Sequence, residues 1–232
     1  MQQEKVYKYR IKVRKLRELK FISHLDWQNL ILKVFRRCEL KLALSCGFNK
    51  MPKVSYSPAL PIFIESDCEL VNFQLLEPIR EDFAKNFKKY SPEGLELVEL
   101  KEITQNTDEP KSLENFCQWA KYEATLKENK NIYNFEKISY IIEKCLSSSE
   151  LLIAKKTKKG IEKTINFRNS LKEMNLNIAQ NDELCLEFVL KVGQNSEIPA
   201  LRADEFLNCV FEEKNIFKIR RINFFDTSMR VI

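Results

Sequence analysis

The order of strand-like and helix-like segments is the feature of this sequence that most limits its fold. Residues 6–13 alternate between two faces as a half-buried strand does, and a helical apolar pattern follows Ser23. Short extended stretches at 40–45, 54–57 and 62–65, a strand at 68–76, a second amphipathic helix at 78–90 and a strand at 95–103 come next. The resulting order, strand, helix, strand, strand, helix, strand, is that of a split βαβ unit with a ferredoxin-like fold.

The same order of elements is expected to return after the polar, breaker-rich segment 104–110. The expected elements are a strand at 118–127, a helix at 134–146, hairpin strands at 151–157 and 161–167 around Lys158-Lys159-Gly160, a strand at 184–192, a helix at 202–211 and a strand at 217–225. We therefore predict an α+β chain of two tandem ferredoxin-like units with antiparallel sheets, residues 1–104 and 111–232. Because no residue-level repeat is visible, the duplication depends on element order alone.

Charge is distributed unevenly along the chain. Residues 1–60 contain 14 Lys and Arg against 4 Asp and Glu, whereas the remaining residues contain 25 against 29. This excess predicts a basic first domain, and a basic face favours phosphate-bearing partners because binding releases counterions. A solvated charged face without a ligand would have the same composition.

Several classes of protein are disfavoured by composition. No apolar run approaches the roughly 20 residues that span a bilayer, and the N-terminus has no apolar signal segment, so we expect a cytoplasmic chain with no membrane contact. The seven cysteines include no CxxC pair, which predicts buried free thiols rather than ligands of zinc or an iron–sulfur cluster. We expect neither a metal nor a cofactor in this chain.

The segment 21–26, FISHLD, contains the only histidine. Ser23 is expected to cap a helix, with Asp26 in the capping-box position. His24 then lies at the positive helix end, where a neutral imidazole is favoured and could act as an acid–base group or contact a ligand. Ser23, His24 and Asp26 are too close in sequence to align as a hydrolase triad. A purely local cap, a binding role and a catalytic role for His24 all remain open.

Further candidates surround this segment. Arg36 and Arg37 either complement the helix dipole or form a phosphate clamp with Arg10, Arg14 and Lys41. The turn Cys46-Gly47-Phe48-Asn49 could present an aromatic ring for base stacking. The complete set of candidate nucleic-acid or ligand-binding residues is Arg10, Arg14, Ser23, His24, Asp26, Arg36, Arg37, Ser45, Gly47, Phe48, Asn49, Lys53 and Glu69, with His24 also the candidate catalytic residue.

Phe21–Asp26 resembles the FxSHLD signature of the radical-SAM-linked protein family, a domain of unknown function associated with cobalamin-binding radical SAM enzymes. The resemblance continues through Arg36-Arg37, Leu42–Ser45, Gly47–Asn49, Pro52, Ser55, Pro58, Leu60-Pro61 and Ser66–Glu69, with weaker echoes at Lys158–Gly160, Asn166–Arg168 and Lys218–Arg221. Two departures stand out. Lys50-Met51 follows the GFN turn where the family has a histidine or similar polar residue, and Asn166 replaces an expected carboxylate.

The resemblance implies an accessory protein that works with a cobalamin-binding radical SAM enzyme in trans. This chain has no CxxxCxxC triad and no DxHxxG pattern, so any radical chemistry would belong to the partner. We expect an RNA-binding, substrate-presenting role on rRNA or tRNA, and a non-catalytic partner rather than an enzyme. The alternatives are a hydrolase or nuclease that uses His24, and a protein–protein adaptor for the radical SAM subunit.

Overall fold

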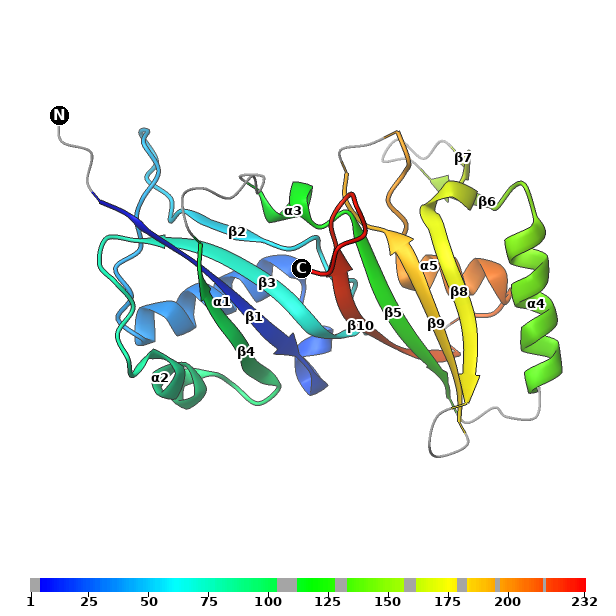
Figure 1. Cartoon of the computed structure of the whole chain (residues 1–232), viewed down its shortest axis with the longest axis horizontal. Helices are drawn as coiled ribbons and strands as arrows, with labels where there is room; N and C mark the ends of the chain where they lie inside the picture. The colour runs from blue at the N-terminus through cyan, green and yellow to red at the C-terminus, as the bar shows by residue number, and fades with distance from the viewer. Residues whose placement is uncertain are drawn as a thin grey trace. The chain divides into compact units, whose positions relative to one another are not determined.

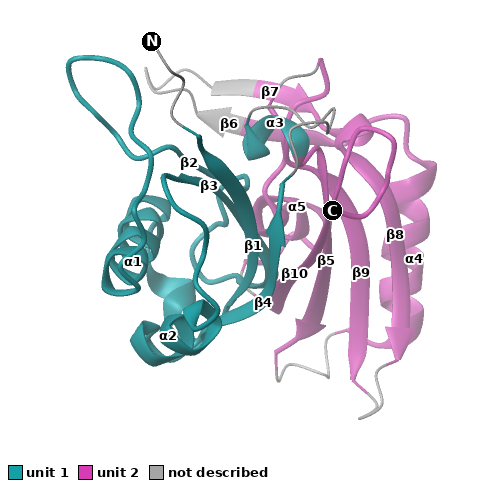
Figure 2. Ribbon diagram, turned by 60° about the vertical axis from the view of Figure 1, so that its left-hand side comes forward, with its two compact units in different colours: residues 1–116 teal, residues 117–232 magenta. Residues whose placement is uncertain are grey.

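The computed structural model describes residues 5–103, 112–127, 133–156, 162–178, 183–194, 197–214 and 216–232. The chain divides into two compact units, Met1–Phe116 and Cys117–Ile232, which Figure 1 follows by residue number and Figure 2 colours separately. The predicted linker at 104–110 and the predicted turn Lys158-Lys159-Gly160 lie outside the described residues. In the described part of the chain, no helix is long and apolar enough to cross a membrane.

The described residues of unit 1 form four strands and two longer helices in the predicted order. Its elements are β1 (Tyr7–Lys15), the 3₁₀ helix η1 (Arg17–Phe21), α1 (His24–Arg37), β2 (Val54–Tyr56), β3 (Glu65–Leu75), α2 (Phe83–Tyr90), β4 (Leu95–Glu102) and the short α3 (Leu113–Phe116). The strands are ordered β4-β1-β3-β2 and every neighbouring pair is antiparallel. Helix α3 lies in unit 1, although the second domain was predicted to begin at residue 111.

The core of unit 1 follows directly from the alternation along β1. Ile11 and Val13 are fully buried, and they belong to one apolar cluster with Trp27, Ile31 and Phe35 of α1. These three helix residues recur at helical spacing, so one face of α1 packs on the sheet. Burying these apolar side chains contributes about 2 kcal/mol each.

Unit 2 repeats the strand connections of unit 1 with one insertion. Its elements are β5 (Trp119–Leu126), α4 (Phe135–Ser147), β6 (Leu152–Lys156), β7 (Glu162–Asn166), the 3₁₀ helix η2 (Arg168–Ser170), β8 (Leu171–Ile178), β9 (Leu184–Lys191), α5 (Ala203–Val210) and β10 (Phe217–Phe225). The strands are ordered β10-β5-β9-β8, again antiparallel throughout. The mixed α/β class with mostly antiparallel strands is thereby confirmed.

The sequence prediction missed strand β8. The hairpin expected to supply the second strand of unit 2 instead forms a separate two-stranded sheet, β6-β7. The strand that pairs with β9 is β8, whose sequence LKEMNLNI places Met174 and Leu176 on one face. Its Asn, Glu and Lys residues are depleted in strands generally, which concealed the alternation.

Aromatic contacts join the layers of unit 2. Tyr122 of β5 stacks on Phe188 of β9 with ring centroids 5.6 Å apart, and Phe188 contacts Phe206 of α5 at 5.2 Å. The buried Arg221 donates a hydrogen bond of 3.1 Å from Nε to the Tyr122 hydroxyl, so this N–H group of the guanidinium has a partner in the core. In the first turn of α5, the carboxylate of Asp204 binds the Arg202 guanidinium at 2.7 Å.

Candidate functional site

The FISHLD segment forms the helix cap that its sequence predicts. Ser23 is the N-cap of α1, and its Oγ accepts a hydrogen bond of 3.1 Å from the Asp26 main-chain N–H. The same hydroxyl donates its proton to Asp26 Oδ2 at 2.7 Å. Because the Ser23 proton is directed to Asp26 and not to an imidazole, the pair acts locally to hold the first turn.

His24 is half-buried at the first position of α1. Its Nε2 lies 2.9 Å from the side-chain nitrogen of Gln28, one turn along the helix. Its ring meets Tyr56 of β2 edge-on, with centroids 6.3 Å apart, and the Tyr56 hydroxyl donates to the Gln28 carbonyl at 3.4 Å. Burial raises the pKa of Tyr56, so this phenol stays protonated. The amide donor at Nε2 favours a neutral imidazole that accepts a hydrogen bond there.

Buried polar residues lie on the helix-covered side of the sheet near the end of β1. Lys15 is 1% exposed, its Nζ donates to the Ile22 carbonyl at 3.3 Å, and it lies over the Trp27 ring at 5.5 Å. Glu69, which pairs with Val13 across the sheet, accepts a hydrogen bond of 2.9 Å from Ser57 Oγ. Glu69 was predicted to bind ligand, but it is only 2% exposed and its carboxylate accepts a hydrogen bond inside the protein.

Two exposed aromatic rings form a patch beside the cap, which we name the Phe21–Phe63 patch. The rings of Phe21 and Phe63 meet edge-on at 5.6 Å, and Lys20 Nζ lies 5.3 Å from the Phe21 centroid. Phe63 is 70% exposed and has a φ of 73°, a conformation that is rare for bulky residues. Its N–H donates to the Lys20 carbonyl at 2.8 Å, which fixes the turn against η1.

The SCGFN turn lies in a separate loop, Ser45–Met51, which we name the Phe48 loop. Its ends are closed by a hydrogen bond of 2.8 Å from the Ser45 N–H to the Met51 carbonyl and one of 3.0 Å from the Met51 N–H to Ser45 Oγ. Gly47 has a φ of 151°, which a side chain would strain. The Phe48 ring is fully exposed, and Asn49 and Lys50 are exposed. In Figure 2 the chain between α1 and β2 reaches out beyond the rest of unit 1.

The predicted arginine clamp does not assemble around this loop. Arg10 is buried, donates from Nε to Asn72 Oδ1 at 2.8 Å and lies over the Phe116 ring at 5.2 Å. Arg14 is half-exposed but pairs with Glu96 at 3.1 Å and Asp67 at 3.5 Å. Neither guanidinium is therefore placed to bind a phosphate without first leaving a protein partner.

The remaining basic candidates are exposed but separated. Arg36 and Arg37 lie in the last turn of α1 and His24 in the first, so roughly 18 Å of helix separates them. Lys41 pairs with Glu77 at 2.5 Å, and Lys53 is exposed at the base of the Phe48 loop. His24, Arg36 and Glu69 thus occupy a helix start, a helix end and the interior, and they do not form one site.

The charge of unit 1 is more balanced than that of its first 60 residues. Acidic side chains of β3 and β4 bind cations of β1 and η1: Arg14 with Glu96, and Lys20 with Glu65 at 4.0 Å. Over the whole unit, 20 Lys and Arg stand against 17 Asp and Glu, a net charge of +3 that equals the value for unit 2. The predicted basic domain is therefore reduced to local clusters of lysine and arginine.

All seven cysteines are free. Cys68, Cys117 and Cys145 are buried as predicted. Cys46 is exposed on the Phe48 loop, so the prediction of a buried thiol is wrong for this residue. Burial is the main factor that raises the pKa of Cys38 to about 11, so this thiol stays protonated. Among the described residues, no three His, Cys, Asp or Glu side chains gather where they could hold a metal ion.

The feature that sequence reasoning missed is the Phe21–Phe63 patch. Phe63 follows two prolines in a loop, and such breaker-rich segments lie at the surface, so an aromatic residue there was the available signal. Asn166, noted as a departure from the expected carboxylate, has a structural role. Its Oδ1 accepts hydrogen bonds from the main-chain N–H groups of Leu151 at 3.0 Å and Arg168 at 2.9 Å.

Comparison with known proteins places the chain in a family. The sequence profile of the uncharacterized proteins conserved in bacteria called DUF2344 matches residues 8–199, and the chain belongs to that family. No curated protein matches. A solved structure that resembles it is the "Crystal Structure of a Cbf5-Nop10-Gar1 Complex", with 8% identity, a TM-score of 0.46, and coverage of 93% of this chain and 48% of that chain. The chain spans about half the length of that protein.

Proposed function

We propose that each unit is a ferredoxin-like domain and that the chain is a tandem of two. The support is topological: the first strand of each unit is flanked by the last and the third strands, in the orders β4-β1-β3-β2 and β10-β5-β9-β8. Each unit also places one helix between its first and second sheet strands and another between its third and fourth. This is the connection order of a split βαβ unit.

We propose that the chain is an accessory RNA-binding protein that presents rRNA or tRNA to a cobalamin-dependent radical SAM enzyme in the cytoplasm. The observation that carries the RNA part is the Phe48 loop, which presents a fully exposed ring. Lys50 and Lys53 are exposed near it in the chain. Unpaired bases stack on exposed aromatic rings, and nearby lysines attract the phosphates. The radical SAM partner is inferred from the resemblance of FISHLD and SCGFN to the linked family.

A nuclease or hydrolase centred on His24 has less support. The Ser23 hydroxyl donates to Asp26, and His24 Nε2 faces the Gln28 amide. A nucleophile within hydrogen-bonding reach of a base is the arrangement that such an enzyme needs. The cap accounts for Ser23 and Asp26 without catalysis, so His24 is better assigned to the packing between α1 and β2.

RNA binding can be tested with a fluorescein-labelled twelve-nucleotide oligouridine and the full chain, by anisotropy across a salt series. Phe48→Ala should weaken binding about tenfold, since stacking of one base contributes about 1–3 kcal/mol. The matched control is Tyr140→Ala, which removes an aromatic ring that is 66% exposed on α4 of unit 2. Binding that is absent at low salt, or equal for Phe48→Ala and wild type, would refute the RNA assignment.

An adaptor role is the second candidate, and the Phe21–Phe63 patch favours it. Exposed apolar rings that sit beside a rigid cap are typical of protein docking sites. In nuclease-treated extract of cells that express the cobalamin-binding radical SAM enzyme, a Phe63→Ser chain should lose stoichiometric co-purification if the patch binds that enzyme. If the wild type and Phe63→Ser both retain the enzyme in untreated extract, and both lose it after nuclease treatment, the contact is assigned to RNA.

A further inference from the structure

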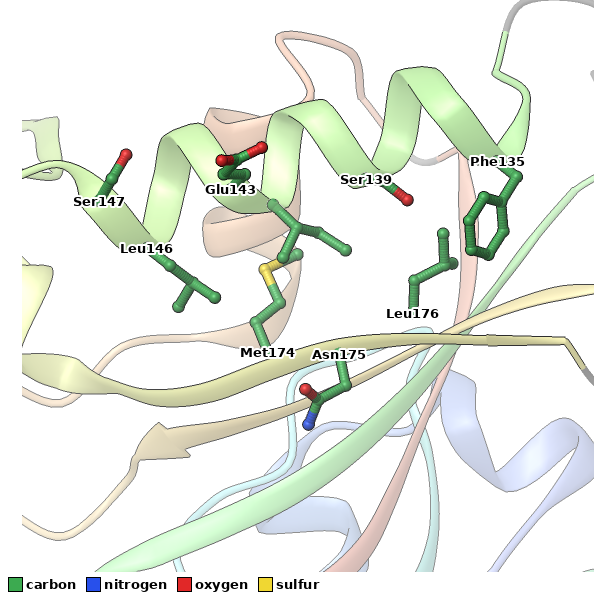
Figure 3. A pocket seen from close by; sticks show the side chains of 9 residues that line it. Phe135, Ser139, Glu143, Leu146, Ser147, Met174, Asn175 and Leu176 are labelled. Carbon is green, nitrogen blue, oxygen red and sulfur yellow. The ribbon is translucent and has the colours of Figure 1, made fainter.

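The strongest unassigned feature is a groove in unit 2 between helix α4 and the last strand of its sheet, β8. The groove has a volume of about 600 Å³. It is lined by Phe135, Ser139, Ile142, Glu143, Leu146 and Ser147 of α4 and by Met174, Asn175 and Leu176 of β8. Figure 3 shows Leu146 and Phe135 pointing from the helix toward the strand, and Met174 and Leu176 pointing from the strand toward the helix.

Strand β8 adds a second, independent property to the groove. It is the terminal strand on its side of the sheet, and it pairs with β9 alone among the described strands. No main-chain hydrogen bond from another described segment reaches residues 172–178. In Figure 3 the Asn175 side chain points away from α4. An uncovered strand of this length is a template for a further strand.

We propose that the groove between α4 and β8 binds an extended peptide segment of a partner protein, which adds to the sheet as a strand beside β8. Main-chain hydrogen bonds to β8 would provide affinity, and alternate side chains would enter the groove. The lengths agree. Phe135 to Leu146 spans about 16 Å of helix at 1.5 Å per residue, which is the length of roughly five strand residues.

The lining also defines the chemistry of the peptide. Phe135, Ile142, Leu146, Met174 and Leu176 make the walls apolar, so side chains at alternate positions of the peptide are apolar. Glu143 is the one ionisable side chain among the described lining residues, and it is exposed. A lysine or arginine in the peptide would complement this carboxylate. Two copies paired through β8 would instead bring their Glu143 residues to one interface, which like-charge repulsion opposes.

The test uses the full chain as bait for a displayed library of random ten-residue peptides. Recovered sequences should alternate apolar residues and contain a lysine or arginine. A synthetic copy of the best sequence should bind Ser139→Trp at least about tenfold more weakly, because the indole fills the groove. Glu143→Lys should weaken it about fivefold, whereas Glu136→Lys, with the same charge change outside the groove, should stay within about twofold.

Hydrogen exchange locates the contact. On binding, amides of β8 that face away from β9 should become protected, and the circular dichroism of each variant shows whether it is folded. The proposal is overturned if the library enriches nothing over a Ser139→Trp bait, or if protection appears away from β8. It is also overturned if the wild type forms a dimer that Ser139→Trp abolishes, since the groove would then bind a second copy.

Discussion

The junction between the first helix and the second sheet strand is closed in unit 1 and open in unit 2. In unit 1, Tyr56 of the three-residue β2 reaches α1, where its ring meets His24 and its hydroxyl bonds to the Gln28 carbonyl. In unit 2 the corresponding elements, α4 and the eight-residue β8, leave a groove between them. The same chain connections thus place an aromatic contact at this junction in unit 1 and a lined groove in unit 2.

The contrast locates the two kinds of surface. Unit 1 uses its helix–edge junction for packing, so its exposed aromatic rings lie on connecting segments, in the Phe48 loop and the Phe21–Phe63 patch. Unit 2 keeps the junction itself available. Binding residues on loops are adaptable, whereas a groove on a helix and a strand is fixed in shape. This difference agrees with the two proposals, single-stranded RNA as a flexible ligand of unit 1 and an extended peptide as the ligand of unit 2.

The largest effect should come from the buried polar residues of unit 1. Glu69→Ala removes the acceptor of the Ser57 hydroxyl and a buried carboxylate, and should cost about 3 kcal/mol of unfolding free energy. Hydrogen exchange of β1 and β3 amides would measure the loss in unit 1, with β5 and β9 as an internal reference. Glu96→Ala, which removes only an exposed partner of Arg14, should cost less than about 1 kcal/mol. Equal effects of the two variants would contradict a structural role for Glu69.

A smaller effect is expected when the closed junction is opened. Tyr56→Ala removes the half-buried ring between α1 and β2 and should destabilise unit 1 by about 2 kcal/mol. Tyr56→Phe keeps the ring and removes only a hydrogen bond of 3.4 Å, so it should cost less than about 1 kcal/mol. Urea titration followed by tryptophan fluorescence would compare them. If both variants match the wild type, the ring does not seal the junction.

The pH dependence of unit 2 should depend on Asp226, which follows β10. The main-chain N–H of Arg230 is the chief cause that lowers the pKa of this carboxyl, and the Arg230 guanidinium and the Ser228 N–H add to it. A lowered folded-state pKa stabilises the fold above the unfolded value of about 3.9, and the gain is lost as the pH falls through the folded-state value. Asp226→Asn should cost about 1 kcal/mol at neutral pH. It should also flatten the acid limb of stability measured for β5 and β9 by hydrogen exchange.

The smallest effect separates packing from catalysis at His24. His24→Gln should change the unfolding free energy by less than about 1 kcal/mol, because its side chain is half-buried and can still bond to Gln28. It should also leave oligouridine binding within about twofold, since the proposed stacking is on Phe48. A loss of RNA cleavage in His24→Gln, relative to a wild type that cleaves, would reverse the assignment.

Local signals predicted the parts of the fold that local interactions build. The Ser23 cap and helix α1 were predictable because the hydroxyl, the helix N–H groups and the apolar stripe lie within one short segment. Strand β8 was missed because its pairing with β9 is not visible in its own sequence, and because its Asn residues resemble a loop. The burial of Arg10 and Glu69 was also hidden, since Asn72 and Ser57 approach them only in the folded sheet.

The candidate site shows the same distinction between features that depend on local sequence and features that depend on long-range contacts. Phe48 was predictable as an exposed ring, because glycine and asparagine beside it indicate a turn. The clamp of Arg36 and Arg37 with Arg10, Arg14 and Lys41 could not be judged from composition. Acidic residues of β3 and β4 pair with Arg14, and they are distant from it in the sequence. The groove between α4 and β8 has no sequence motif, since it depends on the space between two elements that β6 and β7 separate in the sequence.

The pairing of each unit's first strand with its last has a consequence for folding during synthesis. In unit 1, β1 pairs with β4, so Tyr9 gains its partner on that side only when Glu102 has been synthesised. In unit 2, β5 pairs with β10, so Trp119 gains its partner only when Phe225 has been synthesised. Neither unit can complete its sheet until nearly its whole length has left the ribosome. Such long-range closure makes folding slow and leaves the first strand uncovered meanwhile. Nascent chains stalled before residue 95 should therefore stay protease-sensitive. Once β4 has emerged from the ribosome, the sheet of unit 1 can be completed while unit 2 is still being synthesised.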